Sequence, residues 1–119
     1  MAHLDITNLH CVKTRDGFGG DGDEVDVYLK VDGGAERHVS GPHRLDKSRN
    51  DEDVTLNIHE PFNTEVLVRL RERNGARGGS NDLDLGVQDI GPAVQGARDL
   101  SFSGNNGRVV YTARIGVSA

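Results

Sequence analysis

Hydrophobic and polar residues alternate along most of this 119-residue chain with a period of two. Alternation of this kind places apolar side chains on one face of a β-strand and polar side chains on the other. The pattern is clearest at residues 24–31, 54–59, 64–71 and 108–117 and weaker at 4–12, 35–39, 83–87 and 100–103. No stretch has a helical period long enough to predict a helix. The pattern therefore predicts an all-β, eight-stranded antiparallel β-sandwich that forms one domain over residues 1–119.

Several breaks in the alternation predict turns and irregularities. The apolar phase slips by one residue between Ile6 and Leu9, which predicts a β-bulge near Thr7 and Asn8. Asp-Gly-Gly at residues 32–34 and Asn-Asn-Gly at 105–107 predict hairpin turns. Gly41 and Pro42 predict the end of the third strand, because proline cannot donate a ladder hydrogen bond. Glu-Pro-Phe-Asn at residues 60–63 predicts another turn.

Composition narrows the function classes. The chain is 34% hydrophobic, 28% charged and 4% aromatic, with a formal net charge of -5. This acidic balance argues against nucleic acid, which proteins bind through a positive face, and against direct attraction to an anionic bilayer. Cys11 is the only cysteine, so no internal disulfide forms, and we expect it to be a buried residue of the first strand.

No signal peptide or apolar run of membrane-spanning length is apparent. We therefore expect a soluble, cytoplasmic product, with export by a route that uses no cleavable signal left open.

Acidic residues gather in a Gly-rich loop and at the start of the strand that follows it. Five carboxylates fall within eleven residues, and at close range they repel one another by about 1 kcal/mol per pair in water. They are Asp16, Asp21, Asp23, Glu24 and Asp26. Glycines let several oxygens point at one centre, and a hard cation such as calcium takes six to eight of them. The stretch therefore predicts a divalent-cation site on a β scaffold.

The predicted strand order gathers most acids at one end of the molecule. Successive antiparallel strands reverse direction, so the connections after the first, third and fifth strands share an end. These connections hold Asp16, Asp21, Asp23, Glu24, Asp46, Asp51, Glu52, Asp53, Glu72, Asp82 and Asp84, whereas the connections at the other end hold only Asp32 and Glu60. A cation site explains this asymmetry, although acids also lie in loops simply to keep a protein soluble.

Three segments resemble parts of C2 domains. DVYLKV at residues 26–31, after its Gly- and Asp-rich loop, resembles the Asp-Pro-Tyr-Val-Lys-Val segment of that family. Residues 66–86 resemble its later strand and acidic loop, and GRVVYTARI near the C-terminus resembles the strand that closes the chain in the permuted strand order. The resemblance implies calcium ligands at Asp16 and Asp26, with Asp21, Asp23 and Glu24 as competitors, and in the later loop at Glu72, Asn74 and Asp82 or Asp84.

The resemblance also implies a function, with departures from the family pattern. In C2 domains calcium lets an acidic end meet phospholipid, and Phe18 and Arg77 occupy the loop-tip positions here. Glu72 and Asn74 stand where the family prefers aspartates, and fewer charges predict weaker calcium binding. Residues 37–49 form a basic segment that could supply a headgroup or protein contact.

The alternative to a calcium-dependent module is a structural or interaction β-sandwich in which calcium only stabilises loops or is not bound. We do not expect an enzyme, because the sequence shows no nucleophile paired with a base and no zinc-ligand spacing. Carbohydrate binding is disfavoured by the absence of Trp and the presence of just two tyrosines, Tyr28 and Tyr111.

Overall fold

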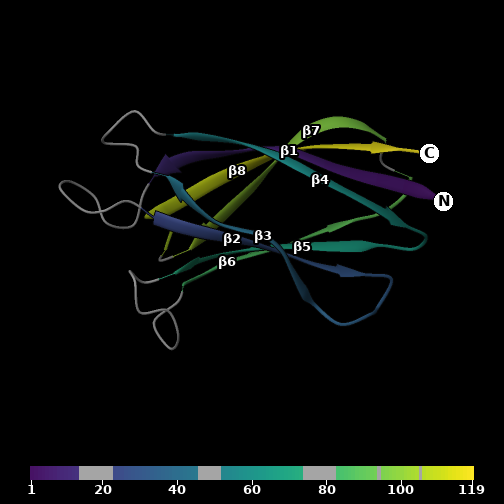
Figure 1. Ribbon diagram of the computed structural model, residues 1–119, viewed down its shortest axis with the longest axis horizontal. Helices are drawn as coiled ribbons and strands as arrows, with labels where there is room; N and C mark the ends of the chain where they lie inside the picture. Colours follow the sequence, from purple (N-terminus) through teal and green to yellow (C-terminus); the bar gives the residue numbers. More distant parts are fainter. Residues whose placement is uncertain (14–22, 46–51, 74–82, 94, 105) are drawn as a thin grey trace.

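The computed structural model describes residues 1–13, 23–45, 52–73, 83–93, 95–104 and 106–119. These residues form eight antiparallel strands in two four-stranded sheets (Figure 1). The strands are β1 (Ala2–Lys13), β2 (Asp23–Val31), β3 (Arg37–Leu45), β4 (Asp53–Phe62), β5 (Val66–Arg73), β6 (Leu83–Ile90), β7 (Gly96–Gly104) and β8 (Val109–Ser118). The order is β4-β1-β8-β7 in one sheet and β3-β2-β5-β6 in the other, which confirms the predicted β-sandwich.

The described residues include no helix long and apolar enough to cross a membrane.

The core lies between the two sheets and consists of alternate residues from each strand. Its largest fully buried side chains include Tyr111, Phe62 and Phe102. Cys11 is also buried in the core, as the sequence predicts. The predicted bulge is also present, because the register of β1 with both β4 and β8 shifts between Ile6 and Asn8. The bulge keeps Leu4 and Ile6 on the same side as the residues that follow it.

Strand β3 differs from its prediction. It continues through Gly41 and Pro42 to Leu45, and the Gly41-Pro42 peptide bond is cis. The register of β3 against β2 shifts between Val25 and Val27. The prediction that Gly41 and Pro42 end the strand is wrong. An edge strand pairs on one side only, so a proline nitrogen without a hydrogen can face away from the partner strand.

Strand β4 also continues through a proline, near its C-terminal end. It includes Pro61 and Phe62, where the sequence predicts a turn, and Pro61 lies opposite His3 of β1. β4 is also an edge strand, where a proline nitrogen without a hydrogen can face away from the partner strand.

Three connections that carry the predicted acids leave from one end of the sandwich, which we call the acid-rich end. In one sheet, Asp23 lies opposite Leu45, Glu24 opposite Arg73 and Glu72 opposite Leu83. In the other sheet, the Cys11 amide donates to the Glu52 carbonyl and Lys13 lies opposite Val110. Figure 1 shows these strand ends on one side of the molecule. Gly104 links the sheets here, since a Cβ at this position would lie 2.9 Å from the Asp84 carbonyl oxygen.

The opposite end holds both termini and a polar anchor. Ala2 lies opposite Phe62, and His3 lies opposite Ser118 (Figure 1). The Asp32 carboxylate accepts hydrogen bonds from the backbone amides of Asn63, Thr64 and Glu65. The turn after β2 is therefore tied to the turn between β4 and β5.

Candidate functional site

The structure describes only some of the predicted metal ligands. Asp16, Asp21, Asn74 and Asp82 lie outside the described residues, as do the loop-tip residues Phe18 and Arg77. Asp23 is placed as the first residue of β2, without a described side chain. Glu24, Asp26, Glu72 and Asp84 are described in full.

These four carboxylates do not face a common centre. Glu72 shares the inward face of β5 with Leu70 and is 1% exposed. Asp26 and Asp84 belong to the outer face of the same sheet, where Asp84 pairs with Arg69. Within the described ranges, no three His, Cys, Asp or Glu side chains lie close enough together to hold a metal ion.

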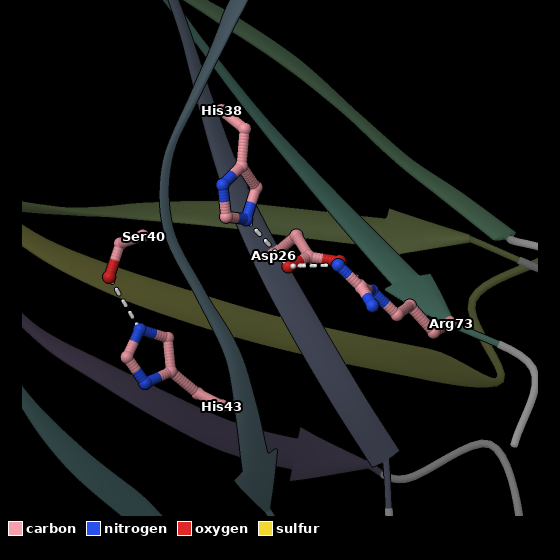
Figure 2. Close-up of polar contacts among 5 residues, drawn as sticks. All are labelled: Asp26, His38, Ser40, His43 and Arg73. Atoms are coloured by element: carbon pink, nitrogen blue, oxygen red, sulfur yellow. Dashed lines mark hydrogen bonds and ion pairs between the residues drawn. The ribbon is translucent and has the colours of Figure 1, made fainter. Parts of the chain in front are cut away.

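Asp26, one of the described predicted ligands, lies in a network of polar contacts. Its side chain is 1% exposed although it lies on the outer face of β2. Arg73 Nε donates to Oδ2 at 2.6 Å and Arg73 Nη2 to Oδ1 at 3.3 Å, while His38 Nε2 lies 2.8 Å from Oδ1 (Figure 2). Asp26 therefore joins three strands, since His38 belongs to β3 and Arg73 to β5.

The backbone of β3 completes the burial of Asp26. Gly41 has φ +105°, and a Cβ there would lie 3.0 Å from Asp26 Oδ1 and 2.6 Å from the Val25 carbonyl oxygen. Only glycine combines this conformation with so close an approach. The irregular stretch of β3 at Gly41 and Pro42 thus covers the carboxylate.

A second polar pair lies beside this site. Ser40 Oγ is 2.5 Å from His43 Nε2 (Figure 2). Partial burial lowers the pKa of His43, opposed by the nearby Asp26 charge and assisted by His38, so the ring favours its neutral form. The structure thus brings together a hydroxyl and a base, which the sequence analysis did not expect. The Asp26 oxygens contact Arg73 and His38. Asp26 therefore does not orient His43 as the acid of a catalytic triad orients its histidine.

Further arginines line the outer face of the same sheet. Arg69 Nε donates to Glu36 at 2.8 Å, and Arg69 also pairs with Asp84. Burial alone would raise the pKa of Asp84, but hydrogen bonds from the Gly86 amide and Arg69 outweigh it and lower the pKa. Arg71 lies over the Tyr28 ring, with its guanidinium carbon 5.8 Å from the centroid. Asp84 is thus a partner of arginine in this structure.

Sequence analysis missed Arg73 as the partner of Asp26 and assigned His38 only to a basic segment. A signal was present in the alternation. Arg69, Arg71 and Arg73 share the outer face of β5, and Asp26 shares the outer face of the neighbouring β2. Pairing β2 with β5 in the correct register would have placed an arginine row beside Asp26.

Comparison with known proteins identifies the fold. No family model matches the chain, and no curated protein matches its sequence. Among solved structures, the C2A domain of plant Extended Synaptotagmin 1 aligns with a TM-score of 0.58 over 98% of this chain and 90% of that chain, at 11% identity. The fold is C2-like. A chain from the Cry23Aa1 and Cry37Aa1 binary protein complex aligns with a TM-score of 0.54 over 100% of this chain and 99% of that chain, at 10% identity.

The C2-like fold confirms the architecture that the sequence resemblance implies. At these identities the likeness extends to the fold alone.

Proposed function

We propose that this C2-like protein is a binding module whose acid-rich end takes calcium and, through it, contacts a membrane or protein surface. The observation that supports the proposal is the position of the strand ends. Those flanking residues 14–22, 46–51 and 74–82 all lie at one end of the sandwich. The segments that carry these acids therefore start and end on the same side of the fold.

The chemistry of the proposed ligands fits a hard cation. Asp16, Asp21, Asn74 and Asp82 would supply carboxylate and amide oxygens, which calcium prefers, with Asp23 and Glu24 nearby in sequence. Bound calcium would offset the mutual repulsion of these acids and reverse the local charge. A surface with anionic groups, such as phospholipid headgroups, would then be attracted to this end.

Calorimetric titration of calcium into chelator-treated protein tests the proposal. We expect measurable heat from the wild type and affinity about tenfold weaker for Asp82→Asn, a change of ~1.4 kcal/mol. Asp99→Asn is the matched control, because Asp99 is an exposed carboxylate of β7 that pairs with Arg114. An absence of heat, or equal losses in the two variants, would contradict calcium binding at the acid-rich end.

A second candidate is an interaction module that needs no ion. The pairing of Asp26 with Arg73 and His38 favours it. The C2 resemblance implies that Asp26 is a calcium ligand, but its carboxylate is already paired with the Arg73 guanidinium. The similar chain from a binary protein complex also comes from an assembly of proteins.

Co-sedimentation with phospholipid vesicles separates the two candidates. The first predicts that calcium brings the protein down with anionic vesicles, whereas the second predicts at most a higher melting temperature in calcium.

A further inference from the structure

Asp26 already has a positive partner at the position where the C2 resemblance implies a metal ligand. We infer that the Arg73 guanidinium, assisted by His38, is a built-in cation that replaces a metal ion at Asp26. The inference does not depend on whether other acids of the acid-rich end bind calcium.

The burial of the Asp26 carboxylate is the reason that Arg73 has this role. A carboxylate removed from water is strongly destabilised unless a positive charge and hydrogen bonds compensate it. Asp26 is 1% exposed, and Arg73 reaches both of its oxygens, with Nε at 2.6 Å from Oδ2 and Nη2 at 3.3 Å from Oδ1. His38 adds a contact of 2.8 Å to Oδ1. A calcium ion needs its oxygens at about 2.3–2.6 Å and would have to displace these groups.

The partners of Asp26 are fixed parts of the sheet (Figure 2). Arg73 belongs to β5, where it lies opposite Glu24 of β2, and His38 lies opposite Tyr28 of the same strand. Gly41 covers the carboxylate from β3. The compensating charge is therefore covalently attached to the fold and remains when metal ions are removed.

This role predicts an asymmetry between the two sides of the ion pair. Arg73→Gln leaves a buried carboxylate without its main counter-ion. Asp26→Asn leaves Arg73 and His38, whose side chains are 38% and 41% exposed, in reach of water. Loss of the cation should therefore lower the stability of the fold more than loss of the anion. Removing both should lower the stability less than removing the cation alone.

Melting temperatures of Arg73→Gln, Asp26→Asn and the double variant test the inference, measured with chelator and with millimolar calcium at equal ionic strength. Arg71→Gln is the matched control, because Arg71 is an exposed arginine on the same face of β5. We expect Arg73→Gln to melt well below the control and the double variant to recover part of the loss. Calcium should raise the melting temperature of Arg73→Gln more than that of the double variant.

Two results would overturn the inference. One is an Arg73→Gln protein that melts with the Arg71→Gln control, and the other is a double variant no more stable than Arg73→Gln. If Arg73→Gln does not fold, recovery of folded protein in the double variant supports the inference and continued misfolding contradicts it.

Calcium affinity separates this inference from the proposed function. Here Asp26→Asn should leave any calcium heat of the wild type unchanged, whereas a ligand role for Asp26 predicts weaker binding. Absence of calcium heat from the wild type and from Asp26→Asn would contradict the proposed function and leave the melting comparison of the Arg73 and Asp26 variants intact.

Discussion

Asp32 shows how one carboxylate can organise a turn. Its oxygens accept the amides of Asn63, Thr64 and Glu65, and its own amide donates to the Glu65 carbonyl at 2.9 Å. Asp32 has φ +50°, a left-handed conformation that Asp and Asn tolerate better than most residues. Hydrogen bonds from Thr64 and Asn63 lower the pKa of Asp32 below its usual 3.8.

We predict that Asp32→Asn lowers the melting temperature at neutral pH. Asparagine keeps the shape and tolerates the backbone conformation, but its amide loses the charge that the backbone donors stabilise. Because the folded-state pKa is lowered, the stabilisation is present above the usual value and is lost as pH falls through the folded-state value. Melting curves of both proteins should therefore converge in strong acid. A difference that persists unchanged there would contradict the assignment.

Glu65 should behave in the opposite way. Asp89 raises the pKa of Glu65 above its usual 4.5, through charge repulsion and a hydrogen bond, and burial and Asp32 add to the effect. A raised pKa means that folding favours the protonated form, so stability falls as pH rises through the folded-state value. We predict that Glu65→Gln melts at or above the wild type at pH 7, with the gain vanishing in acid. A lower melting temperature at pH 7 would show that other contacts of Glu65 dominate.

At the level of whole strands, the alternating pattern correctly predicted which segments form strands, but it did not predict where some of them end. The period of two predicted the bulge in β1 and all eight strands. It failed at Pro42 and Pro61, because a sequence shows a proline but not whether its strand lies at a sheet edge. Both residues lie in edge strands, where a missing donor is tolerated.

Strand β3 depends on Gly41, and this gives a prediction. Gly41→Ala should destabilise the fold by about 1–3 kcal/mol, the range for a non-glycine residue held in a strained conformation, with further cost from contact with the Val25 carbonyl. Gly116→Ala is the matched control, because a Cβ at Gly116 in β8 meets nothing within 4 Å and its φ is ordinary. The control should change stability by no more than about 0.5 kcal/mol. Denaturant unfolding would measure both, and equal effects would contradict a special role for Gly41.

For the whole molecule, topology made the polar asymmetry predictable, whereas the partners of individual side chains did not follow from it. Strand parity correctly assigned the acid-bearing connections to one end of the sandwich. The period of two does place Glu72 on the inward face, in phase with Leu70, but it could not show that Asp84 pairs with Arg69. Cross-strand pairs depend on which strands are neighbours, and that order is a property of the complete fold.

Both termini lie beside the Asp32 turn, at the far end from the acid-bearing connections (Figure 1). A fluorophore, affinity handle or immobilising linker fused to either terminus would therefore emerge on the side away from these connections. A sensor surface that captures the protein through such a linker would leave the acid-rich end facing vesicles or soluble partners.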